Sequence, residues 1–370
     1  MLLVFLGLLA VVFFALTGVL VSAFHRHQDH EGRLWFARGE SDLGAGQAQA
    51  AIDDFRNALQ FSRGDPRYHL RLIDALLAAQ RTEEARAYLL TLWAQQPASG
   101  IINLQLARLA ASSGNSSEAR RYFNNSIYGV WEDDPMAHRL AVRLEFAQFL
   151  VREHDDAGAQ ADLITLAANA PRDPALLTQI GRLFLQAGNP NRALEQFHGA
   201  LRLDPKAAGA EAGAGLASFR LGDYRDAQRH LQRVVHQDPS DSASTDLLQL
   251  CTAILEADPF APNLNARQRA DRCWQDYQRA GQRLRACAQQ AGESLDVPQA
   301  TTELQGLAAR ARLLRPRPSA ASFLRDPDLM QGAWEWLLDV ESTTAARCGP
   351  PTGADQALWY IARRRHEGSQ

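Results

Sequence analysis

The fold of this chain is decided by the segment ALLTQIGRLFLQAGNPNRALEQFHGALRLDP, which runs from Ala175 to Pro205. Its apolar residues recur three and four positions apart on both sides of Gly188, which is the spacing of amphipathic helices. The pattern returns 34 residues later at Gly215, Gly222, Ala227, Leu231 and Pro239. We therefore predict helical hairpins that stack on one another, because a single hairpin cannot cover its own apolar face.

Four more copies of this pattern precede Ala175. The nearest copy has His154 in the position of the turn glycine, and a six-residue insertion near Asp134–Arg139 then shifts the frame. The copies are marked by Ala159, Leu163 and Pro171; by Leu106, Gly114, Ala119 and Phe123; by Leu72, Leu76, Ala85, Leu89 and Pro97; and by Trp35, Gly39, Gly46, Ala51, Phe55 and Ala58. Six repeats of 34 residues plus the insertion account for residues 32–241.

The residue types that recur have physical roles in a hairpin. Small residues such as Gly181 allow two helices to approach closely, and Phe197 fills the space beside them. Gly188 can adopt the left-handed conformation that ends a helix. Asp204-Pro205 ends the second helix, because the residue before proline resists helix and proline donates no hydrogen bond.

This pattern resembles the tetratricopeptide repeat family, whose signature is W-x2-L-G-x2-Y, then A-x3-F, then P. The resemblance covers about 210 of the 370 residues. The chain departs from the signature at Arg38, Asp42, Arg63 and Trp131. The resemblance implies an all-α, right-handed solenoid of helical hairpins that holds protein partners.

The N-terminus carries a second signal. Residues 2–24 contain no charge and would extend about 34 Å as a helix, enough to cross the roughly 30 Å hydrocarbon core of a bilayer. We predict a retained transmembrane anchor. A cleaved secretion signal is the alternative, since Val21 and Ala23 form a small-residue cleavage site.

The charges beside this segment bear on its orientation. Arg26, Arg33 and Arg38 follow it closely, so the positive-inside rule places the repeats in the cytoplasm. A periplasmic placement is the alternative, because membrane-anchored tetratricopeptide proteins occur in both orientations.

The remaining sequence also has a helical pattern. Residues 242–257 are predicted to cap the solenoid, and residues 258–370 form a C-terminal helical region of no recognised type. Within this region we expect helices at 264–291, 299–314, from Asp326-Pro327 onward, and at 354–366.

Cysteine usage gives no metal or redox motif. Cys251, Cys273, Cys287 and Cys348 are widely spaced, so zinc ribbons and thioredoxin motifs are excluded. Cys273 and Cys287 lie about 21 Å apart along one helix and cannot bridge each other. Either one could pair with Cys251 or Cys348 in a periplasmic domain, and buried free thiols are the other interpretation.

Composition and motifs argue against catalysis. The chain is 46% hydrophobic and 22% charged with a net charge of −3, as in ordinary folded proteins. Arginines are concentrated between residues 262 and 318, which we interpret as a solvated helix face, so no nucleic-acid partner is predicted. No phosphate loop, nucleophile elbow or metalloprotease motif occurs, and His25, His27 and His30 form the sole histidine cluster. We predict no enzyme, cofactor, metal site or small-molecule substrate.

The family resemblance implies a binding groove lined by the first helix of each repeat. Transferred to this chain, the lining comprises Arg67, Leu70, Asp74, Leu104, Arg108, Leu144, Gln148, Arg152, Arg182, Leu185, Phe219 and Arg220. Arginines beside apolar side chains would suit a protein or peptide ligand with acidic groups. The predicted function is a membrane-anchored scaffold or assembly factor. The alternatives are a periplasm-facing accessory protein of envelope export or polysaccharide biogenesis, and an enzyme in the C-terminal third.

Overall fold

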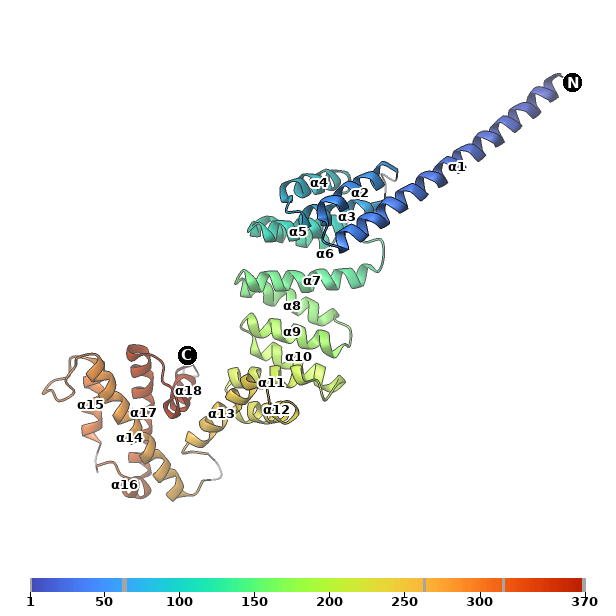
Figure 1. Cartoon of the computed structure of the whole chain (residues 1–370). Coiled ribbons are helices and arrows are strands. Elements are labelled where there is room, and N and C mark those ends of the chain that lie inside the picture. Colours follow the sequence, from blue (N-terminus) through green and yellow to red (C-terminus); the bar gives the residue numbers. More distant parts are fainter. Residues whose placement is uncertain (1, 62–64, 262–263, 315–316, 368–370) are drawn as a thin grey trace. The chain divides into compact units, whose positions relative to one another are not determined.

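The computed structural model describes residues 2–61, 65–261, 264–314 and 317–367. The chain forms two compact units, Met1–Glu153 and His154–Gln370. The described residues contain helices and no strand (Figure 1). Among them, a single isolated bridge joins Ser99 to Val130. The predicted all-α architecture of helical hairpins is therefore confirmed.

The first unit is a run of antiparallel helices in which each helix packs against the next in sequence (Figure 1). Its helices are α1 (Leu2–Gly44), α2 (Ala48–Phe61), α3 (Pro66–Ala78), α4 (Thr82–Gln95), α5 (Gly100–Ser112), α6 (Ser116–Ile127) and α7 (Pro135–Arg152). The end of α1 with α2, α3 with α4, and α5 with α6 form three hairpins. We call α1, α3, α5 and α7 the first helices, and the helices that follow them the second helices.

The second unit continues the hairpins and adds a C-terminal bundle (Figure 1). The solenoid part holds α8 (Asp156–Asn169), α9 (Pro174–Gln186), α10 (Pro190–Leu203), α11 (Ala208–Leu221), α12 (Tyr224–Gln237) and α13 (Ser242–Ala257). In this unit, α9 and α11 are first helices. The bundle holds α14 (Ala266–Gln290), α15 (Glu303–Leu313), α16 (Ala320–Arg325), α17 (Pro327–Cys348) and α18 (Ala354–Glu367).

Glycine and phenylalanine pack closely across a hairpin in each of the two units. A Cβ atom added to Gly181 of α9 would lie 2.7 Å from the ring of Phe197 on α10. A Cβ atom on Gly39 of α1 would lie equally close, at 2.7 Å, to the ring of Phe55 on α2. Both phenylalanines are completely buried. The repeated small residue is therefore required because the ring packs directly on the backbone.

The turn between two helices of a hairpin requires a residue in the left-handed backbone conformation, whether or not that residue is glycine. Gly222 has φ +74° after α11, as expected for a C-terminal helix cap. His154 has φ +57° at the position where its repeat lacks glycine. This conformation is uncommon for a residue with a side chain, so the geometry of the hairpin overrides the local preference.

The inserted residues are divided between a connection and a helix. Residues 128–134 connect α6 to α7, and α7 has 18 residues where α5 has 13. The sequence placed the insertion somewhat later, at Asp134–Arg139. Asp134 caps α7 through its side chain, which accepts a hydrogen bond from the Ala137 N–H.

The predicted membrane anchor is not supported. No helix in the described part of the chain is long and apolar enough to cross a membrane. Half of the prediction falls on residues 2–12, whose side chains lie outside the described residues. From Phe13 to Phe24, α1 exposes Phe13, Phe14, Leu16, Val19, Leu20, Val21 and Phe24.

The C-terminal bundle has its own apolar core, in which Phe323, Trp336 and Leu337 are buried. Helix α16 was not predicted, because six residues are too few to show helical periodicity. Ser319 and Ser322 form its capping box, and Phe323 anchors it in the core. Helix α18 packs on both α13 and α17, so the bundle adjoins the end of the solenoid within this unit.

Candidate functional site

In the first unit, ion pairs run across the faces of the first helices where the groove was predicted. Arg71 of α3 donates a 2.8 Å hydrogen bond to Glu40 of α1. The same guanidinium donates a 3.0 Å bond to Asp74, one turn further along α3. The faces of α1 and α3 that carry these side chains therefore adjoin each other.

The next pair joins α5 to α7. Arg108 donates from Nε and Nη2 to the two carboxylate oxygens of Glu145, at 2.7 Å each. These bonds raise the pKa of Arg108 above its ordinary value, and the negative charge of Asp74 acts in the same direction. Because Asp74 lies on α3, the electrostatic contact continues from α3 to α5. We call Glu40, Arg71, Asp74, Arg108 and Glu145 the charge ladder.

The charge ladder changes the chemistry that the sequence predicted for this groove. It holds three carboxylates against two guanidinium groups, so its arginines are neutralised within the chain. An acidic ligand would have to displace Glu145 to reach Arg108. Arg67 is also engaged, because it binds the carboxylate of Asp65 at 2.7 and 3.0 Å and thereby lowers the pKa of Asp65.

The other residues predicted for this unit differ in accessibility. Leu104 is buried in the core, whereas Leu70, Leu144 and Gln148 are partly exposed. Arg152 is exposed in the last turn of α7, and no ion pair of the described residues includes it. Arg152 is therefore the predicted groove arginine of this unit that is available to a ligand.

In the second unit the predicted residues lie on α9 and α11. Leu185 is buried, and its carbonyl accepts a 2.6 Å hydrogen bond from Arg220. Arg182 is exposed and lies over the backbone of Gly209, where an added Cβ would be 2.6 Å from its guanidinium. Within the described part of the chain, Arg182 takes part in no ion pair. Arg220 thus ties the two first helices together, and Arg182 is available.

Phe219 is covered by the last helix of the chain. The ring of Tyr360 on α18 makes an edge contact with Phe219, with a centroid distance of 5.2 Å. Arg364, one turn later, donates to the carbonyl oxygen of Gly222 and lies 5.8 Å from the ring centre of Tyr224. Phe219 is therefore part of an internal contact and is not a free wall of a groove.

The sequence did not lead us to Glu40, Arg71 and Glu145 of the charge ladder, or to the contact between Tyr360 and Phe219. A signal for the ladder was present, because each cross-helix pair joins opposite charges separated by about one repeat: 31 residues for Glu40–Arg71 and 37 for Arg108–Glu145. No comparable periodicity marks Tyr360, since α18 lies outside the repeats.

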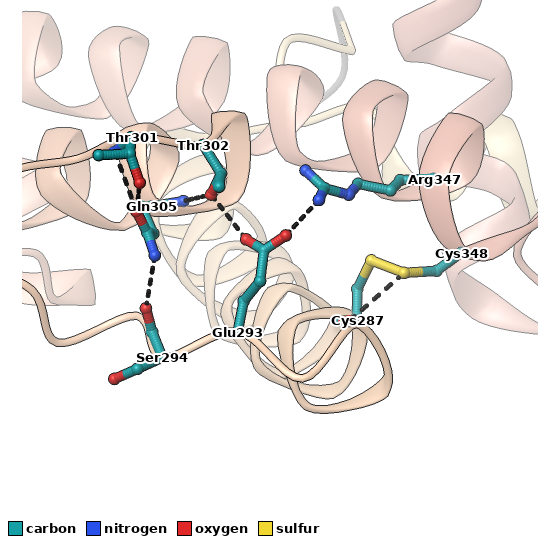
Figure 2. Close-up of polar contacts among 8 residues, drawn as sticks. All are labelled: Cys287, Glu293, Ser294, Thr301, Thr302, Gln305, Arg347 and Cys348. Carbon is teal, nitrogen blue, oxygen red and sulfur yellow. Dashed lines mark hydrogen bonds and ion pairs between the residues drawn. A yellow bond between two sulfur atoms is a disulfide. The ribbon is translucent and has the colours of Figure 1, made fainter.

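The C-terminal bundle is fastened at the ends of three helices (Figure 2). A disulfide joins Cys287 of α14 to Cys348 of α17. Nearby, Glu293 accepts hydrogen bonds from Arg347 and, at 2.6 Å, from Thr302, the N-cap of α15. The Cys287–Cys348 disulfide is one of the cysteine pairings that the sequence left open. Cys251 and Cys273 are buried free thiols.

Gln305 of α15 extends this network (Figure 2). Its side chain accepts a 2.9 Å bond from the Thr301 N–H and donates a 3.1 Å bond to the Ser294 carbonyl. The segment between α14 and α15 is therefore held by polar contacts at both of its ends.

Two buried carboxyl groups lie in the bundle. Burial raises the pKa of Glu341 to about 8, although Arg283 lies 3.2 Å away and opposes the shift. Burial likewise raises the pKa of Asp276 to about 6, against the effect of Arg279. Neither carboxyl lines the cavity of about 530 Å³ between α15 and α17 or the cavity of about 360 Å³ beside Trp334. Both carboxyl groups are buried in the core of the bundle.

Comparison with known proteins supports the repeat architecture. The sequence profile described as "Tetratricopeptide repeat" matches residues 42–99 and 184–259. No curated protein matches the chain. The two matched segments cover parts of both units.

Solved structures with a similar fold include part of a tetratricopeptide-repeat protein from Cytophaga hutchinsonii, at 13% identity and TM-score 0.47, covering 65% of this chain and 93% of that one. Pseudomonas aeruginosa pilF matches at 12% identity and TM-score 0.43, covering 60% and 98%. YrrB, a tetratricopeptide protein with an unusual peptide-binding site, matches at 16% identity and TM-score 0.42, covering 53% and 97%. Similarity at this level concerns the fold.

Proposed function

We propose that this chain is a non-catalytic scaffold or assembly factor that binds a peptide or protein subunit along the first helices of its repeats. The proposal is carried by the contacts between successive first helices. In the first unit, Arg71 binds Glu40 and Arg108 binds Glu145. In the second unit, Arg220 binds the carbonyl oxygen of Leu185. Stacked hairpins with adjoining first helices provide an extended surface for a ligand.

Each unit has one available arginine among the predicted groove residues, and these two arginines define the chemistry of the ligand more narrowly than the sequence did. Arg152 and Arg182 are exposed without ion pairs among the described residues, whereas Arg67 and Arg108 are already neutralised. The ligand we expect therefore carries isolated acidic groups between apolar side chains, because a uniformly acidic peptide would be repelled by the carboxylates of the charge ladder.

Crosslinking in cells followed by purification and quantitative mass spectrometry tests this proposal. Arg152→Glu combined with Arg182→Glu should reduce the yield of specific crosslinked partners about tenfold, because each reversal replaces an attraction by a repulsion. The matched control is Arg121→Glu combined with Arg192→Glu, which changes two exposed arginines on second helices. An identical partner set for both double variants would refute the groove assignment.

The disulfide favours a periplasmic location of the repeats. The arginines that follow residues 2–24 favoured the cytoplasm instead. Cys287–Cys348 would persist in an oxidising compartment such as the periplasm, and disulfides are rare in the reducing cytosol. This supports the second candidate function, a periplasm-facing accessory protein of envelope export or polysaccharide biogenesis. Acid quenching and alkylation of cells should leave Cys287 and Cys348 unmodified until a reductant is added; alkylation of both without reductant would favour the cytoplasm.

We also propose that the N-terminal part of α1 attaches the protein to a membrane. The support is the run of exposed apolar side chains between Phe13 and Phe24, which would be costly to hydrate. Deleting residues 2–24 should move the protein from the membrane pellet to the carbonate-soluble fraction. An unchanged distribution would show that this segment is not the attachment.

A further inference from the structure

The connection between α6 and α7 displays large apolar side chains that neither the core nor the groove uses. Tyr128 is 75% exposed, and Val130 and Met136 are each 67% exposed. All three lie in or beside residues 128–134, where the 34-residue period is interrupted. Insertions in repeat proteins map to loops on one face, which is often a binding face.

The backbone of this connection is fixed to the preceding repeat. The Val130 N–H donates a 2.7 Å hydrogen bond to the Ala98 carbonyl, and the Val130 carbonyl accepts a 2.8 Å bond from the Gly100 N–H. The hydroxyl of Ser126 donates to the Gly100 carbonyl at 2.8 Å. Val130 is therefore presented on a rigid support, although its side chain is in solvent.

Trp131 anchors the same connection through its side chain. The indole N–H donates a 3.0 Å bond to the Ser126 carbonyl, and His138 stacks on the indole at a centroid distance of 4.4 Å. A Cβ atom on Gly100 would lie 2.3 Å from the indole, so the ring packs directly on the backbone there. Trp131 occupies the position of the repeat's usual proline, and this departure from the pattern builds the connection.

Tyr128 is oriented by an arginine of the next helix. The Arg143 guanidinium lies 5.8 Å from the centre of the Tyr128 ring and donates a 3.4 Å hydrogen bond to its hydroxyl. A tyrosine held in this way loses less conformational entropy on binding than a freely rotating one. Rigid, exposed aromatic side chains of this kind are typical binding hot spots.

Charge beside the apolar residues indicates the chemistry of the partner. Glu132 and Asp133 are exposed between Val130 and Met136, and no ion pair in the described part of the chain includes either of them. Carboxylates at the rim of an apolar contact favour a partner with lysine or arginine at its own rim. A second copy of this chain fits less well, because a symmetric contact would bring two such acidic pairs together.

We propose that Tyr128, Val130 and Met136, none of which is a predicted groove residue, form a docking surface for a protein whose apolar contact area is bordered by basic side chains. The surface combines exposed apolar area, a rigid backbone and unpaired acidic neighbours. It gives the scaffold a second attachment point in the first unit.

Methyl NMR of the full chain labelled at methionine tests this proposal directly. The chain has three methionines, and Met136 is exposed whereas Met330 is 8% exposed in the second unit. An amphipathic peptide of leucine and lysine is the probe, and a peptide of equal length with glutamate in place of lysine is its counterpart. We expect the lysine peptide to shift the Met136 signal at about tenfold lower concentration than the glutamate peptide, without shifting Met330.

Variants distinguish this surface from non-specific adhesion. Tyr128→Ser combined with Val130→Ser should abolish the shift of Met136 and leave the Met330 signal and helix content unchanged, because both side chains are exposed. The matched control, Ile164→Ser with Leu203→Ser, removes apolar side chains that are 46% and 42% exposed in the second unit and should preserve the shift. Glu132→Gln with Asp133→Asn should make the two peptides equivalent.

Three outcomes would overturn the proposal. The first is equal binding of both peptides to the unaltered chain. The second is a shift of the Met136 signal that survives Tyr128→Ser with Val130→Ser. The third is a shift of the Met136 signal with protein concentration in the absence of peptide, which would assign the surface to a second copy of this chain. The groove variants Arg152→Glu and Arg182→Glu should leave this titration unchanged, so failure of the groove assignment is a separate result.

Discussion

Arg108 of α5 and Glu145 of α7 form a two-pronged ion pair, with both nitrogen–oxygen distances at 2.7 Å. The pair bridges first helices of consecutive repeats, on either side of the inserted connection. Exposed ion pairs contribute only about 0.2–1 kcal/mol to stability, so this one governs the charge of the surface more than the existence of the fold.

Glu145→Gln should therefore release Arg108 at little cost in stability. We expect the free energy of unfolding to fall by at most about 1 kcal/mol, because both side chains are partly in water. Binding of a glutamate-rich probe peptide should strengthen, since Arg108 becomes available. Denaturant unfolding and fluorescence titration measure the two effects. Arg108→Gln in the same background should remove the gain; a gain that persists would contradict the role given to Arg108.

Gly181→Ala should destabilise the solenoid of the second unit. The new Cβ would lie 2.7 Å from the Phe197 ring, and overpacking of this kind costs about 1–3 kcal/mol. Gly306→Ala in α15 is the matched control, because no atom lies within 4 Å of its added Cβ. Gly306 is partly exposed inside the helix, so alanine should stabilise α15 by about 0.5–1 kcal/mol. Thermal unfolding should move in opposite directions for the two variants, and a loss of similar size in both would be inconsistent with close packing at Gly181.

Removal of the Cys287–Cys348 disulfide should loosen the C-terminal bundle. The bond closes a loop of 61 residues, and disulfides typically contribute about 2–4 kcal/mol. Reductant should lower the melting temperature of the unaltered chain and have no effect on Cys287→Ser with Cys348→Ser. Thiol titration of the unfolded chain should give the two free cysteines before reduction and all four afterwards. Four thiols in the protein as isolated would disprove the bond.

The stability of the bundle should decrease as pH rises from about 4.5 to 8. Burial raises the pKa of Glu341 from 4.5 to about 8, so within this window the folded chain holds a proton that the unfolded chain releases. Asp276, raised from 3.8 to about 6, acts with the same sign at lower pH. Glu341→Gln should flatten the dependence between pH 6 and 8 in thermal unfolding; an unchanged slope would show that Glu341 is ionised in the folded chain.

Local sequence was sufficient for the hairpins because their determinants are close in the chain. The spacing of Gly181 and Phe197 specifies a contact within one hairpin, and the structure confirms it. His154 shows why the period is stronger evidence than any single residue. Its φ of +57° follows from the geometry of the hairpin and not from its own preference.

The partners of the predicted groove residues could not be read from the repeat pattern, because charge pairing depends on which helix faces meet. The family pattern selected Arg67 and Arg108 for their positions, without regard to Asp65 and Glu145, which neutralise them. It also selected Phe219, which Tyr360 covers from a helix 141 residues further along the chain. No repeat period connects residues so far apart.

The sequence by itself determined that the chain folds into helical hairpins, since helix spacing, turn glycines and proline stops act over a few residues and recur. Only the tertiary structure decided which arginines are free, which cysteines pair and where apolar side chains remain in solvent. These properties depend on distances between residues far apart in the chain, and such distances are fixed only when the helices pack.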